Sequence, residues 1–163
     1  MKYLKLVAQM SSLLLTLILV GCSTTKTEDS TTAGDNNSSF VSFNKIEQEY
    51  LNSLNNLHWP EGTILPTTLE GETADSFQIG YGDSRASMLW EITWQKEWLE
   101  TYNTNPARAN LALEELEKAF NMGYMSPQRA DDSTRNYFKE ILEKAKLGDP
   151  SGFEESIRAN SIN

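Results

Sequence analysis

Cys22 is the only cysteine in the chain, and this constrains the fold more than any other feature of the sequence. A single cysteine forms no disulfide within the chain, and it cannot supply the several thiolates of a structural zinc site. A folded domain here must therefore be held together by a hydrophobic core. The roughly 120 residues that follow the polar N-terminal region are enough for one domain, which would bury about two-thirds of the surface of its unfolded chain.

The N-terminal 22 residues form a recognisable targeting pattern. Lys2 and Lys5 are followed by an apolar run that ends in Leu19-Val20-Gly21-Cys22. This run resembles the bacterial lipoprotein signal, whose lipobox is Leu-(Ala/Ser/Val)-(Gly/Ala)-Cys. The resemblance implies that residues 1–21 are a signal peptide, that Cys22 receives the lipid, and that the mature protein is anchored at the extracytoplasmic face of a bacterial membrane.

The apolar run fits two other kinds of segment less well. A membrane-spanning helix needs about 20 mostly apolar residues, but Gln9, Ser11 and Ser12 interrupt this run. A plain secretory signal favours an Ala-x-Ala-like cleavage site, which is not found here. Both features favour lipidation over these alternatives. A lipoprotein cysteine that carries two acyl chains would be anchored stably, whereas a single chain binds a membrane only weakly. Ser23 does not decide between an inner membrane, an outer membrane and a single-membrane host.

The composition changes after the lipobox. Residues 22–39 comprise Cys22 and a polar stretch in which Ala33 is the one apolar residue. Such a stretch cannot bury apolar surface, so it is predicted to be a disordered tether, spanning roughly 20–25 Å on average. Residues 40–163 are then expected to form the folded domain.

The charge balance and the histidine count exclude several classes of function. The chain has 23 acidic and 14 basic residues and a net charge of −9, which disfavours binding to nucleic acid or to anionic lipid headgroups. His58 is the only histidine, so zinc sites built on several histidines are excluded and a Ser-His-Asp triad would have to use His58. The common nucleotide, metalloprotease and serine-hydrolase motifs are missing, and no cofactor is predicted.

Apolar residues recur at helical spacing along most of residues 40–163. Asn105-Pro106 and Asp131 or Asp132 have the composition of helix starts, and Asp83 or Ser84 is expected to cap the second helix. The fold class predicted is all-α, a small bundle of four to five helices with an irregular Pro- and Gly-containing segment between the first and second helices. The first four helices are expected near residues 42–57, 83–102, 106–123 and 131–148. A short fifth helix is expected after Asp149-Pro150, around Phe153 and Ile157.

The second of these helices carries an unusual set of side chains. Trp90, Trp94 and Trp98 share a broad apolar arc, and Glu91 and Gln95 fall inside it. One interpretation is an aromatic-lined pocket with a carboxylate and an amide at its floor, suited to a sugar, a peptide or an organic cation. The candidate ligand-binding residues are Trp59, Tyr81, Glu91, Trp94, Gln95 and Trp98.

The alternative interpretation is a packed core. In that case Glu91 would pair with Arg108, Arg129 or Arg135, or with a tryptophan N–H. The tryptophan helix, together with Trp59-Pro60 and Gly80-Tyr81-Gly82, also resembles uncharacterised small secreted bacterial proteins, a resemblance that implies no activity.

These features predict a non-enzymatic envelope lipoprotein that binds a protein, peptide or glycan outside the membrane, to which it is attached through the lipid at Cys22. An immunity or inhibitor lipoprotein directed against a toxin or lytic enzyme is one alternative. An envelope hydrolase using Asp/Glu chemistry is another, and His58 next to Trp59-Pro60 is a candidate general base.

Overall fold

A computed structural model of the chain describes residues 39–160. The predicted signal peptide at residues 1–21, the lipid attachment at Cys22 and the tether as far as residue 38 lie outside the described residues. The prediction of a folded domain over residues 40–163 falls almost entirely within them.

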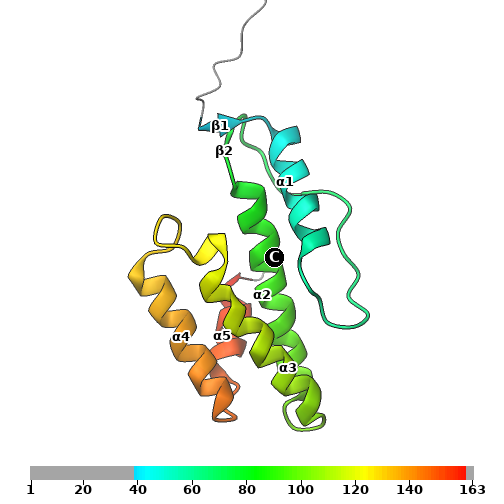
Figure 1. The fold of residues 1–163 in the computed structure, drawn as a ribbon, viewed down its shortest axis with the longest axis vertical. Helices are drawn as coiled ribbons and strands as arrows, with labels where there is room; N and C mark the ends of the chain where they lie inside the picture. The colour runs from blue at the N-terminus through cyan, green and yellow to red at the C-terminus, as the bar shows by residue number, and fades with distance from the viewer. Residues whose placement is uncertain (1–38, 161–163) are drawn as a thin grey trace, which may run out of the picture. The chain divides into compact units, whose positions relative to one another are not determined.

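Helices dominate the described part of the chain, as the sequence predicted (Figure 1). An all-α bundle is confirmed, with five α-helices, two 3₁₀ turns and one pair of two-residue strands in residues 39–160. The elements are β1 (Phe40–Val41), α1 (Phe43–Asn56), β2 (Phe77–Gln78), α2 (Tyr81–Thr101), α3 (Pro106–Glu117), η1 (Lys118–Asn121), η2 (Gly123–Met125), α4 (Asp132–Lys146) and α5 (Ser151–Asn160).

Local sequence signals explain where α3 and α4 begin. The side chain of Asn105 accepts a hydrogen bond from the backbone N–H of Arg108, and Pro106 occupies the first helical position. The carboxylate of Asp131 accepts from the backbone N–H of Thr134 at 2.7 Å. Each side chain satisfies one of the backbone donors that a helix leaves free at its start.

The start of α2 differs from the prediction. The helix begins at Tyr81, after Gly80 in the left-handed conformation with φ of 84°, and not after a cap at Asp83 or Ser84. Glu49 of α1 accepts a hydrogen bond from the backbone N–H of Gly80 at 2.9 Å. The carboxylate of Asp83 instead accepts a hydrogen bond from the hydroxyl of Ser53. Glu49 and Asp83 therefore both connect α1 to the N-terminal end of α2.

Helices α1 and α2 are in close contact at Gly82. A Cβ atom at this position would lie 2.0 Å from the carbonyl oxygen of Ile46 and 2.8 Å from the backbone nitrogen of Tyr50. Only a glycine lets the two backbones approach so closely. Gly82 therefore fixes the place at which α1 crosses α2.

Helix α2 contributes to two hydrophobic clusters. Trp90, Trp94 and Trp98 pack into a larger cluster with side chains of α3, α4 and α5. Ala86 belongs to a smaller cluster formed mainly with α1, where Ile46 and Leu54 are buried. The other helices are arranged around α2, which packs against α1, α3 and α5 (Figure 1).

The segment between α1 and α2 is irregular, as predicted, but it is anchored at several points. The carbonyl oxygen of His58 accepts hydrogen bonds from the indole N–H groups of both Trp90 and Trp94, at 2.8 and 3.0 Å. Farther along, Leu69 and Phe77 are buried in the smaller cluster. Phe77 also belongs to β2, which pairs antiparallel with β1 and places Val41 opposite Phe77.

Candidate functional site

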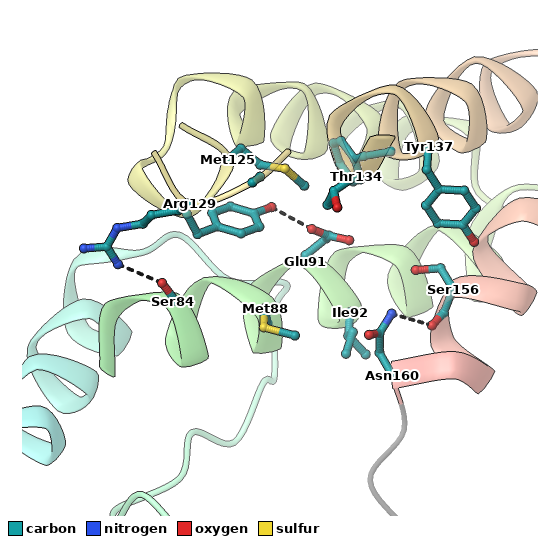
Figure 2. A pocket seen from close by; sticks show the side chains of 13 residues that line it. Ser84, Met88, Glu91, Ile92, Met125, Arg129, Thr134, Tyr137, Ser156 and Asn160 are labelled. Carbon is teal, nitrogen blue, oxygen red and sulfur yellow. Dashed lines mark hydrogen bonds between the residues drawn. The ribbon is translucent and has the colours of Figure 1, made fainter. Parts of the chain in front are cut away.

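A pocket of about 280 Å³ opens between α2, η2, α4 and α5 (Figure 2). Its walls are mainly apolar and aromatic, and a few hydroxyl and amide groups reach it from α4 and α5. This composition is typical of small-molecule sites, where apolar walls supply affinity and a few polar groups set orientation. The lining side chains include those of Met88, Glu91, Tyr124, Met125, Thr134 and Tyr137.

One side of α2 forms a wall of the pocket. Ser84, Met88 and Glu91 are spaced four and three residues apart, so they lie along one side of the helix. The tryptophans occupy the neighbouring side and are directed into the larger cluster. Glu91 thus lies at the border between the buried face of α2 and the pocket.

Glu91 is the polar centre of the pocket. The hydroxyl of Tyr124 donates a hydrogen bond to Glu91 Oε2 at 2.7 Å, and the amide of Gln95 donates to Glu91 Oε1 at 2.9 Å. Part of the Glu91 surface remains exposed. Burial among its neighbours nevertheless raises the pKa of Glu91 to about 7, although the two hydrogen bonds act to lower that pKa. Burial and the nearby carboxylate raise the pKa of Tyr124, which therefore remains a neutral donor.

The predicted ion pair between Glu91 and an arginine is wrong. All three candidate arginines bind other groups within residues 39–160. Arg108 forms two hydrogen bonds to Glu97, Arg129 donates to the hydroxyl of Ser84, and Arg135 donates to Asp132. Figure 2 shows the guanidinium of Arg129 turned toward Ser84 and away from Glu91. The predicted alternative, a tryptophan N–H, is also excluded for Trp90 and Trp94, which donate to the carbonyl oxygen of His58.

Of the six candidate ligand-binding residues, only Glu91 lines the pocket. Trp94 and Trp98 are 1% and 2% exposed in the larger cluster. Gln95 is fully buried behind Glu91, which it orients. Trp59 donates its indole N–H to the carbonyl oxygen of Leu54, and Tyr81 donates its hydroxyl to Glu72. The structure therefore does not bring these six side chains together around one cavity.

Sequence reasoning missed most of the pocket wall. Tyr124 comes from η2, Thr134 and Tyr137 from α4, and Ser156 from α5, so only tertiary packing brings them to Glu91. The one signal in the sequence was the stripe formed by Ser84, Met88 and Glu91, which runs beside the tryptophans.

His58, the candidate general base, belongs to a separate cluster. Its side chain is 63% exposed, and Nδ1 lies 2.9 Å from Oε1 of the buried Glu115. Burial alone would raise the pKa of Glu115, but hydrogen bonds from Lys118 and His58 hold that pKa below its ordinary value. In the part of the chain that the structure describes, no serine or threonine hydroxyl is hydrogen-bonded to the His58 ring. The cluster ties the irregular segment to α3.

Comparison of the chain with protein-family models, curated proteins and solved structures found no match. Within residues 39–160, no helix is both long and apolar enough to cross a membrane. The same residues contain no group of three or more His, Cys, Asp or Glu side chains that could hold a metal ion.

The raised pKa of Glu91 predicts a pH-dependent stability. Its ordinary pKa is 4.5, and in the folded protein it is about 7, so the folded state keeps a proton that the unfolded state releases. The free energy of unfolding should therefore fall as the pH rises from 4.5 to 7, with the full penalty present above 7. Glu91→Gln removes this penalty and should raise the free energy of unfolding near pH 8 by at most about 3 kcal/mol, less where solvent screens the charge.

Urea unfolding of the full chain near pH 5 and near pH 8 measures this effect. The gain from Glu91→Gln should be much smaller at the lower pH, and the exposed Glu114→Gln on α3 is the matched control. A loss of several kcal/mol at both pH values would instead show that Glu91 is a partner in a structural ion pair.

Proposed function

We propose that this protein is a lipid-anchored lipoprotein of the bacterial cell envelope, and that its helical domain is a non-enzymatic binding module. The observation that carries the binding role is the pocket, which has a partly exposed carboxylate whose hydrogen-bond partners among the described residues are both neutral. A carboxylate surrounded by apolar groups is costly to keep ionised. Within residues 39–160 Glu91 forms no ion pair with another helix, so the packing of these helices does not require its charge.

The lipobox supports the location in this proposal. Lipidation at Cys22 would hold the domain outside the membrane, and the polar residues up to 39 would separate it from the lipid surface. The pocket would then be accessible to small molecules, peptides or glycans of the envelope.

The pocket favours binding over catalysis. Hydrolysis by Asp/Glu chemistry needs two carboxyl groups about 5–10 Å apart on either side of the bond that breaks. Glu91 is the only carboxylate among the lining residues that the structure describes. The other polar side chains at the pocket are hydroxyl groups, an amide and Arg129, which can orient a ligand but do not complete such a pair.

Methionine methyl groups offer a direct test of the binding role. Met88 and Met125 line the pocket, whereas Met122 packs against the larger cluster without lining it. In methyl spectra of the full chain purified in detergent, small aromatic fragments of positive, neutral and negative charge are added in turn. At least one fragment should shift the signals of Met88 and Met125 and leave that of Met122 in place.

A blocking variant controls this test. Thr134 lies at the exposed rim of the pocket, so Thr134→Trp should cover the opening and abolish the shifts. Asn136→Trp, at another exposed position of α4 that does not line the pocket, should leave them unchanged. Shifts that persist in Thr134→Trp, or that never involve Met88 and Met125, would contradict the proposed binding site.

A further inference from the structure

We infer that the ligand of this pocket is an organic cation, namely an ammonium group carried on a small apolar body. The inference rests on the proposed binding function and names the chemical class that the pocket would select. It follows from the hydrogen bonds of Glu91, the aromatic and thioether walls, and the position of the nearest arginine.

The described partners of Glu91 do not compensate its negative charge. Its two hydrogen-bond donors, the Tyr124 hydroxyl and the Gln95 amide, are both neutral. A carboxylate has about four lone-pair sites, so these donors leave acceptor capacity on both oxygens. An ammonium group supplies up to three donors together with the positive charge that the site lacks.

Aromatic and thioether side chains form much of the pocket wall around the carboxylate. The rings of Tyr124, Tyr137 and Phe138 line the pocket, and so do the thioethers of Met88 and Met125. Aromatic faces attract cations, and the attraction grows when both groups are shielded from water. Thioethers adapt to the shape of an apolar ligand. The volume of about 280 Å³ suits a small molecule.

Arg129 is the one cationic side chain among the described lining residues. Its guanidinium donates to the carbonyl oxygens of Gly80 and Ile79 and to the hydroxyl of Ser84. These acceptors hold it at one end of the pocket, away from Glu91 (Figure 2). It therefore leaves the carboxylate open to a positively charged ligand.

Binding of a cation should depend on pH because it requires ionised Glu91. The titratable groups that line the pocket together with Glu91 are Tyr124 on η2, Tyr137 on α4 and Arg129, which lies between these two in the sequence. On α5, Glu155 and Arg158 interact electrostatically with Tyr137. Burial raises the pKa of Tyr137 as well as that of Tyr124, so both stay neutral at physiological pH. Glu91 is then the group that titrates as the pH falls below about 7.

Three probes that share a phenylethyl body and differ in charge test this inference. They are phenethylamine, which stays protonated between pH 5.5 and 8, the neutral 2-phenylethanol, and the anionic 3-phenylpropanoate. Their dissociation constants are measured near pH 8 from the methyl shifts of Met88 and Met125 in the full chain in detergent. The amine should bind at least about tenfold more tightly than the alcohol, a difference of about 1.4 kcal/mol.

Two comparisons assign this preference to Glu91. Glu91→Gln should remove the preference for the amine, whereas Glu114→Gln, on an exposed part of α3, should keep it. Lowering the pH to about 5.5 should weaken amine binding by about tenfold or more, because most Glu91 side chains then carry a proton.

The outcomes separate this inference from the proposed function. If the alcohol or the anion binds as well as the amine and still shifts Met88 and Met125, the cation specificity is wrong and the binding function stands. A preference for the amine that survives in Glu91→Gln overturns the role of the carboxylate. If no probe shifts either methyl group, both the inference and the proposed pocket function are overturned.

Discussion

Replacing Trp94 with alanine is expected to lower the free energy of unfolding by about 3–5 kcal/mol. The Trp94 side chain is 1% exposed and packs in the larger hydrophobic cluster. Its indole N–H donates to the carbonyl oxygen of His58 at 3.0 Å, so the substitution removes both packing and one anchor of the irregular segment. The sequence left open whether this ring was a pocket wall or part of the core, and its burial places it in the core.

Chemical denaturation of the full chain checks this expectation. Trp94→Phe keeps an aromatic ring but loses the N–H donor and should cost less than Trp94→Ala. Ile64→Ala is the control, because Ile64 is 93% exposed and its truncation should change stability by no more than about 0.5 kcal/mol. A loss for Trp94→Ala no larger than that for Ile64→Ala would place the indole outside the core.

Replacing Cys22 with alanine is expected to abolish anchoring. The proposed lipid is attached to this thiol, and no helix within residues 39–160 is suited to cross a membrane. After cell fractionation the mature protein should appear in the soluble fraction, or unprocessed precursor should accumulate. Thr24→Ala keeps the cysteine and should leave the protein in the membrane fraction. Mature Cys22→Ala protein that remained in the membrane would contradict the lipid anchor.

The helical architecture could be predicted because its signals are local. Apolar stripes repeat at helical spacing, and Asn105-Pro106 and Asp131 mark helix starts that the structure confirms. The start of α2 could not be predicted in the same way. Asp83 is a good cap by residue type, but it accepts a hydrogen bond from Ser53 of another helix, and Glu49 binds the backbone at Gly80. Both interactions depend on how α1 meets α2, which no local pattern specifies.

The candidate site shows the same division between local and tertiary information. The sequence could indicate that Glu91 is unusual, because a carboxylate lies beside a stripe of tryptophans on one helix. It could not indicate that the tryptophans turn into the core while Glu91 faces Tyr124, 33 residues farther along the chain. The pocket exists because η2, α4 and α5 surround this side of α2. The spacing of residues along α2 does not indicate which elements pack there.

Helix α2 has a further consequence for how the domain tolerates changes in chain length. Ala86 and Trp90 are one turn apart but belong to different hydrophobic clusters. A residue inserted between them would rotate the following part of the helix by about 100° and direct the wrong side chains into one of the two clusters. The exposed stretch around Ile64 is not helical, so an insertion there would not rotate side chains out of either cluster. Length variation, loop grafts and new termini therefore belong in that stretch, where the chain can grow without changing the register of either cluster.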